Sequence, residues 1–124
     1  MKDKLFKLLD NSYSPYSKYN VAAIVVMKDG KEFNGVNVEN TSYGATICAE
    51  RVAICNAISA GYKKHDFESI YVMNSTEELS IPCFICRQVF LEFFESSKKV
   101  ICMNINGEEK TYLISDLCPY PFNF

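Results

Sequence analysis

The chain has 124 residues, of which 48% are hydrophobic and 23% are charged, and its formal net charge is -2. This length suits one domain over residues 1–124 with a single core. The near-balance of charge, without a long lysine or arginine run, excludes a nucleic-acid surface driven by charge. There is no signal-peptide pattern and no apolar run long enough for a membrane span, so we expect a cytoplasmic protein.

The first third of the chain predicts one short helix followed by two strands. Residues 4–9 have leucines on one face of a helix, and the Ser-, Pro- and Tyr-rich residues 12–19 indicate a loop. The apolar, β-branched run 20–27 predicts a strand. A turn at residues 28–30 returns the chain as a second strand over 31–38.

The rest of the chain alternates helical and extended patterns. Residues 46–60 carry a helical apolar pattern that Gly61 ends, and residues 68–73 predict a buried strand. Pro82 opens a second helical pattern that reaches Phe94. Two more strands are expected over 99–103 and 110–114. This alternation favours a sandwich of helices on a sheet.

The chemically informative residues stand at two predicted helix starts, in the runs Cys48-Ala49-Glu50 and Pro82-Cys83-Phe84-Ile85-Cys86. The chain has six cysteines, and reduced cytosolic thiols in clusters indicate metal binding or catalysis. Residues two apart diverge in mid-helix, but at a helix start both can face a site beyond the end of the axis. The positive end of each helix would also offset the net negative charge of zinc with three thiolates.

A fourth cysteine ligand would make the site structural. Cys55 lies about 10 Å further along the helix from Cys48, too far to share one zinc. The sequence leaves Cys102 and Cys118 open, and His65, the single histidine, is expected in solvent. Three protein ligands with an open position for water is the catalytic arrangement.

Glu50 has two possible roles at this position. In hydrolytic deamination, a carboxylate beside the metal takes a proton from water and passes protons to the substrate. The alternative is an ordinary acidic residue in the first turn of a helix, interacting with backbone N–H groups. Its place beside three cysteines favours the catalytic role.

The pattern of Cys, x-Glu and Pro-Cys-x-x-Cys resembles the zinc-deaminase signature. The stretches YSPYSKYNVAA, GVNVENTSYGATICAERVA and PCFICRQVFLEF are similar to the small cytidine deaminases, in the right order over nearly the whole chain. The resemblance implies a three-layer α/β/α sandwich around a five-stranded mixed sheet, and a homotetramer. It also implies one Zn²⁺ per subunit, held by Cys48, Cys83 and Cys86.

The resemblance further implies the activity and the substrate-binding residues. Water activated by zinc attacks C4 of cytidine or 2′-deoxycytidine, Glu50 moves the protons, and the products are uridine or deoxyuridine and ammonia, a pyrimidine-salvage reaction. The arginine that hydrogen-bonds the zinc thiolates matches Arg51. The family's substrate-binding residues also have counterparts in this chain. Asn37 and Glu39 would bind the ribose 3′-hydroxyl, Tyr19 would lie near the base, and the backbone at Thr41 would meet the pyrimidine edge. Tyr43 and Phe122 would reach the pocket of a neighbouring subunit.

Two departures from the family pattern keep alternatives open. Phe84 and Ile85 stand between the paired cysteines, where the family usually has Gly and Ala, and Tyr19 replaces a usual Phe. The large Phe84 side chain could narrow the pocket and change the substrate. The alternatives are a deaminase of a modified nucleoside, such as a blasticidin-type antibiotic, and a zinc-stabilised nucleoside-binding protein without turnover.

Overall fold

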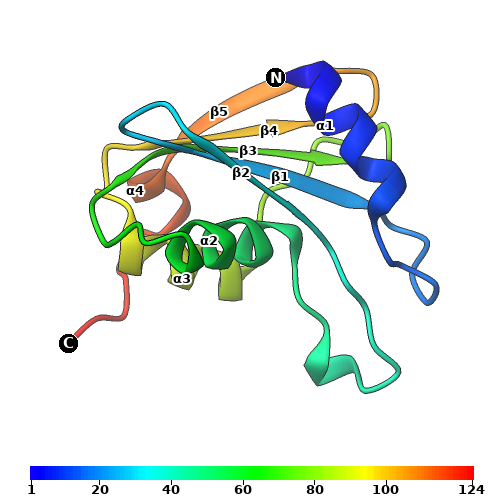
Figure 1. Cartoon of the computed structure of the whole chain (residues 1–124), viewed down its shortest axis with the longest axis horizontal. Helices are drawn as coiled ribbons and strands as arrows, with labels where there is room; N and C mark the ends of the chain where they lie inside the picture. The colour runs from blue at the N-terminus through cyan, green and yellow to red at the C-terminus, as the bar shows by residue number, and fades with distance from the viewer.

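The computed structural model describes residues 1–124, which form one five-stranded sheet in the order β2-β1-β3-β4-β5. The strands are β1 (Val21–Met27), β2 (Glu32–Val36), β3 (Phe67–Asn74), β4 (Lys99–Met103) and β5 (Glu109–Leu113). β3 and β4 run parallel and every other neighbouring pair is antiparallel, so the sheet is mixed, as expected (Figure 1).

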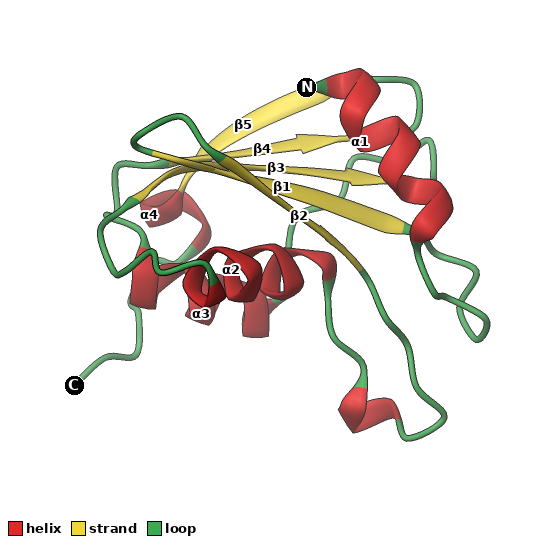
Figure 2. Ribbon diagram, in the orientation of Figure 1, coloured by secondary structure: helices red, strands yellow, loops and turns green.

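Helices cover both faces of this sheet (Figure 2). α1 (Lys2–Leu8) lies on one face, and α2 (Ala49–Ser59) and α3 (Phe84–Phe93) lie on the other. A short helix, α4 (Ile114–Leu117), follows β5, and 3₁₀ turns occupy Leu9–Asn11 and Tyr43–Ala45. The three-layer α/β/α sandwich is therefore confirmed.

The central strand β1 shows why the helices divide in this way. Successive side chains of a strand point to opposite faces, and β1 is apolar on both. Ala22 and Ile24 pack with Leu5 of α1, whereas Ala23 and Val25 join the larger core beneath α2 and α3. A strand buried on both faces needs helices on both faces.

α2 lies unusually close to the edge strand β2. A Cβ added to Gly35 would lie 2.3 Å from the carbonyl oxygen of Ala49 and 2.5 Å from the backbone nitrogen of Ala53. Only glycine leaves room for this backbone contact. The close approach sets the position of the first turn of α2, which carries Cys48 and Glu50.

Both long helices begin later than the sequence predicts. Ile47 does not start α2 but pairs with Val38 in an isolated antiparallel bridge, and Cys48 is the N-cap residue. Similarly, Cys83 is the N-cap residue of α3. The apolar pattern of residues 46–60 continues into this bridge, which is why periodicity alone placed the start too early. α4 was not predicted, because a four-residue helix has too little pattern to detect.

Candidate active site and metal centre

Three cysteines from the two helix starts come together. Cys48 caps α2, Cys83 caps α3, and Cys86 lies buried in the first turn of α3. Their Sγ atoms all lie within 4.8 Å of one another, and the Cys48 and Cys83 sulfurs are 3.7 Å apart. In a tetrahedral zinc site with bonds of about 2.3 Å, two sulfur ligands are about 3.8 Å apart. The donor set and its spacing therefore fit one zinc ion.

The other cysteines do not complete a four-thiolate site. Cys55 is exposed on α2, and Cys102 is buried in β4. The Cys118 thiol donates to the backbone oxygen of Arg87 at 3.4 Å. None belongs to the cluster, so the protein offers three ligands and leaves a fourth position open.

The thiols of the cluster are held in unequal protonation states. A hydrogen bond from the Cys86 thiol, with help from Arg51 and Cys83, lowers the pKa of Cys48 to about 5 despite burial. The same bond and burial raise the pKa of Cys86 far above its ordinary value. The negative charge of the metal-free pair therefore rests on Cys48, at the positive end of α2.

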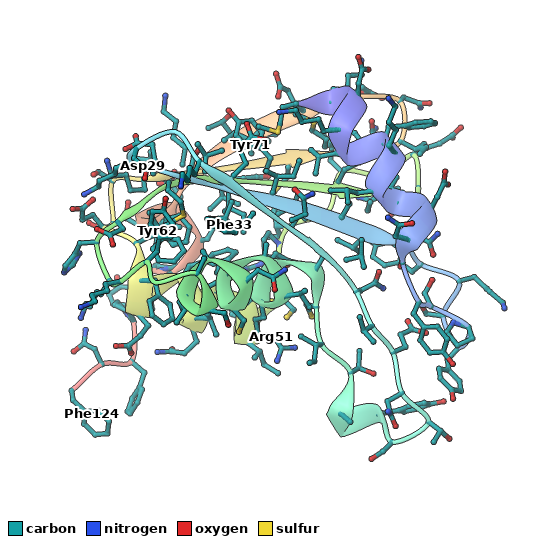
Figure 3. The ribbon with its side chains drawn as sticks, in the orientation of Figure 1. Asp29, Phe33, Arg51, Tyr62, Tyr71 and Phe124 are labelled. Atoms are coloured by element: carbon teal, nitrogen blue, oxygen red, sulfur yellow. The ribbon has the colours of Figure 1, made fainter.

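Arg51 supports this charge. Its Nη2 atom donates to the Cys48 sulfur at 3.5 Å, and the thiolate in turn raises the pKa of the guanidinium. The Nε–H group of Arg51 is buried without a hydrogen-bond partner. Figure 3 shows Arg51 at the start of α2, on the side away from the sheet. The resemblance implies a contact of this kind, between Arg51 and the thiolates of a zinc site.

Glu50 is the buried carboxyl group of the site, with only 4% of its surface exposed. It lies in the first turn of α2, two residues after Cys48. Burial raises the pKa of Glu50 to about 7, with the charge of Cys48 acting in the same direction. A divalent cation nearby would oppose this rise. A carboxyl group that titrates near neutral pH can both accept and donate a proton.

A cavity of about 480 Å³ opens over these groups. It is lined by the start of α2, the residues before α3, the ends of β3 and β4, and two loops. Predicted site residues in its wall are Tyr19, Asn37, Glu39, Cys48, Glu50 and Cys83. Glu50 and two of the thiols thus face the same cavity.

Asn37 and Glu39 shape the loop on one side of the cavity. The Asn37 side chain is buried; its Oδ1 accepts from the Val21 N–H at 2.9 Å and its Nδ2 donates to the Tyr19 carbonyl at 2.8 Å. Glu39 accepts N–H bonds from Tyr16 and Ser17, and the Ser17 hydroxyl bond lowers the pKa of this carboxyl. Their predicted contact with a ribose remains a prediction.

Three predicted substrate residues lie outside this cavity. Thr41 is exposed, and Tyr43 is 78% exposed in the segment that projects from the body after β2 (Figure 1). Phe122 is 68% exposed beside α3, on a separate surface. The resemblance implies that Tyr43 and Phe122 reach the pocket of a neighbouring subunit, and the substrate contacts of all three residues remain predictions.

Phe84 does not narrow the cavity. It is 75% exposed, lies outside the cavity wall, and stacks beneath the Arg87 guanidinium at 4.2 Å. Ile85 is also exposed. Phe84 is the first residue of α3, and its side chain points into solvent while Cys83 and Cys86 on either side join the thiol cluster. Hydrophobic periodicity could not predict which way the Phe84 side chain points.

Sequence reasoning missed several residues of the cavity wall. Thr46, Asn74, Ser80 and Met103 all line the cavity. Asn74 and Met103 end the parallel strands β3 and β4, where a crevice is expected in an α/β sheet. Their position was therefore available as a signal, whereas that of Ser80, in an irregular segment, was not.

The fold and site define a class of protein: an α/β sandwich with a three-thiolate zinc centre beside a buried carboxyl group. Residues 1–104 match the family described as "Cytidine and deoxycytidylate deaminase zinc-binding region". The chain belongs to this family.

Similar proteins support this membership. A cytidine deaminase of Halalkalibacterium halodurans is 40% identical over 113 residues, covering 91% of this chain and 84% of that protein. The crystal structure of cytidine deaminase from Burkholderia pseudomallei has a TM-score of 0.89 at 37% identity, covering 98% of this chain and 99% of that chain. A blasticidin-S deaminase of Bacillus cereus is more distant, with 27% identity over 114 residues, covering 86% of this chain and 79% of that protein.

Proposed function

We propose that the protein catalyses the zinc-dependent hydrolysis of cytidine and 2′-deoxycytidine to uridine or deoxyuridine and ammonia. The observation that carries this proposal is the placement of Glu50, buried in the same cavity as the thiolate cluster. Membership of the deaminase family and the cytidine deaminases among its relatives support the same reaction.

The chain's own residues have distinct tasks in this reaction. Zinc, when bound by Cys48, Cys83 and Cys86, supplies a Lewis acid that lowers the pKa of water. Glu50 takes one proton from the attacking water and delivers it to the ring nitrogen. It then takes the second proton, from the hydroxyl group now on C4, and delivers it to the amine, which leaves as ammonia while the C4 carbonyl forms. Burial of Glu50 keeps these transfers away from bulk water.

The charge of the cavity favours a nucleoside over a nucleotide. No lysine, arginine or histidine lines it, whereas two carboxyl groups, Glu39 and Glu50, do. The lowered pKa of Glu39 keeps that group ionised at neutral pH. A nucleotide's phosphate would meet carboxylates and no cationic side chain in this wall, so cytidine is favoured over deoxycytidylate.

The predicted ligand contacts complete the proposal. Asn37 and Glu39 would hydrogen-bond the ribose with the sides of their polar groups that face the cavity, and Tyr19 would pack near the base. A modified nucleoside is the second candidate, supported by the distant similarity to blasticidin-S deaminase. The non-catalytic alternative loses its motivation, since Phe84 lies outside the cavity wall.

The test is a spectrophotometric assay of zinc-loaded protein on four compounds: cytidine, 2′-deoxycytidine, deoxycytidylate and blasticidin S. Glu50→Ala serves as the control, with zinc content measured on both proteins. We expect turnover of the two nucleosides, little turnover of deoxycytidylate, and none by the variant at equal zinc content. A wild type that holds zinc and leaves both nucleosides unchanged would refute the proposal.

Assembly and location extend the proposal. Exposed aromatic and aliphatic side chains lie on the projecting segment, at the start of α3 and beside α3, which supports a homotetramer; they are Tyr43, Phe84, Ile85 and Phe122. Light scattering should then give about four times the 14.1 kDa chain mass. No helix has the length and apolar composition that crossing a membrane requires. A cytoplasmic location and a role in pyrimidine salvage remain predictions.

A further inference from the structure

The hydroxyl group of Tyr19 makes a contact that the proposed chemistry does not use. It donates a hydrogen bond to the Ser80 hydroxyl oxygen at 3.0 Å, between residues 61 positions apart in the sequence. Both residues line the cavity above the thiolate cluster. The bond therefore joins two separate segments of the cavity wall.

The Tyr19 side of this bond is firmly held. The Asn37 side-chain amide donates to the Tyr19 carbonyl at 2.8 Å, and the Tyr19 N–H donates to the Ser17 hydroxyl at 3.0 Å. Ser17 is in turn bound to Glu39 through its N–H and its hydroxyl. The phenol thus projects from a loop that is fixed to the chain following β2.

The segment before Ser80 is held just as firmly, but only as far as Glu78. The buried Asn74 donates to the Glu78 carbonyl at 3.0 Å, and the buried Asn104 donates to the Glu77 carbonyl at 2.7 Å. Asn74 is the last residue of β3 and Asn104 follows the end of β4, and the two asparagines anchor the start of the segment.

Residues 79–81 have no such anchor. They form no backbone hydrogen bond, and all three are exposed. The Tyr19 hydroxyl makes the one hydrogen bond to this stretch, which leads through Pro82 directly into Cys83. The chain is fixed again at the buried Pro82, whose carbonyl accepts from the Arg87 Nε–H at 2.7 Å. Between the anchored Glu78 and Pro82, the Tyr19 contact is therefore the one hydrogen bond that holds this three-residue stretch of the cavity wall.

We propose that the Tyr19–Ser80 hydrogen bond is a latch that holds residues 79–81 in their ligand-binding position. Tyr19 is then a positioning residue for the nucleoside through its hydroxyl, in addition to the packing role predicted for its ring. This inference rests on the proposed function for its ligand. One net hydrogen bond corresponds to about a two- to tenfold change in an equilibrium constant.

The test compares zinc-loaded wild type with Tyr19→Phe, Ser80→Ala and the double variant. Tyr13→Phe is the matched control, because it removes an exposed phenol hydroxyl that has no hydrogen-bond partner. Three quantities are measured: uridine affinity by calorimetry, KM and kcat for cytidine, and the rate of chymotrypsin cleavage after Leu79. Cleavage reports local opening without any ligand.

Each single variant should raise the cleavage rate, the uridine Kd and the KM by about two- to tenfold, with a smaller effect on kcat. The double variant should equal a single variant, because both changes break the same bond. Additive effects, or single variants that behave like Tyr13→Phe, would overturn the latch. If wild type binds no uridine, the proposed function fails, and the cleavage rates still decide whether the latch exists.

Discussion

The starts of α2 and α3 use the same device for different purposes. Each places a cysteine at the N-cap and aims the positive end of the helix at the thiolate cluster. The next residues of α2 are buried and carry Glu50, whereas those of α3, Phe84 and Ile85, are 75% and 62% exposed. The start of α2 thus supplies one thiol of the cluster and the carboxyl group proposed to transfer protons, whereas the start of α3 supplies two thiols and an exposed apolar surface.

The two helices also pack differently on the sheet. α2 approaches β2 closely through small residues, with Ala53 against Gly35. α3 packs through large aromatic residues, with the Phe90 ring 5.8 Å from Phe94 and the Phe94 ring 5.1 Å from Phe67. The close contact positions Glu50, and the aromatic contact supplies buried area that stabilises the whole layer.

The largest expected effect comes from the aromatic contact of α3. Phe90→Ala should lower the free energy of unfolding by about 3–5 kcal/mol, because a fully buried ring leaves a cavity. Phe84→Ala on the same helix should cost less than about 1 kcal/mol, since that ring is mostly exposed and loses only its contact with Arg87. Urea denaturation at equal zinc content measures the free energy of unfolding of both variants. Equal losses of stability would contradict the difference between the buried and the exposed face of α3.

The next effect concerns the metal ligands. Cys86→Ser should weaken zinc binding by about a hundred- to a thousandfold, because about 10–16 kcal/mol of binding in a four-ligand zinc-finger site corresponds to about 2.5–4 kcal/mol for each ligand. Cys55→Ser, on the exposed side of α2, should bind zinc like wild type. Competition with a chromophoric chelator measures both affinities, and weak binding by the Cys55 variant would place that thiol in the site.

A smaller effect should follow from crowding α2. Gly35→Ala puts a methyl group into the backbone of Ala49 and Ala53, so it should destabilise the fold by about 1–3 kcal/mol. Because α2 must shift, kcat should also fall. Gly44→Ala is the control, since a Cβ there meets nothing within 4 Å. Thermal melts measure the stability of both variants, and initial rates measure their kcat. A wild-type kcat in the Gly35 variant would show that catalysis does not depend on the close contact between α2 and β2.

The smallest effect concerns the contact that follows the C-terminal end of α2. The Tyr62 hydroxyl donates to Asp29 at 2.6 Å, beside Phe33 (Figure 3). This bond lowers the pKa of Asp29 and raises the pKa of Tyr62 to about 12. The contribution of this hydrogen bond to the stability of the fold should therefore be constant between about pH 4 and pH 10. It is lost as pH falls through the lowered pKa of Asp29 or rises through about 12.

Tyr62→Phe should lower Tm slightly within that pH range and converge on wild type outside it, because the bond lies at the surface. Tyr71→Phe, whose hydroxyl has no hydrogen-bond partner, is the control. Melting curves from pH 3 to about pH 12 measure the difference in Tm between each variant and wild type. A difference that persists unchanged at pH 3 would show that the lost contact does not depend on the Asp29 charge.

Much of the site could be predicted because its residues are local in sequence. Cys48 and Glu50, and likewise Cys83 and Cys86, are close enough that helix geometry relates them directly. The exclusion of Cys55 followed from distance along one helix, and the structure confirms it. Cys102 and Cys118 stayed open, because their relation to the cluster depends on how strands and helices pack.

The sequence by itself determined the order and type of the main elements, the ligand spacing, and the membership of a zinc-deaminase family. Only the tertiary structure decided that Ile47 pairs with Val38, that Phe84 faces away from the cavity, and that Tyr19 reaches Ser80. The physical reason is that periodicity and spacing report contacts within about two helical turns. Contacts between distant segments arise only when the layers pack against one another.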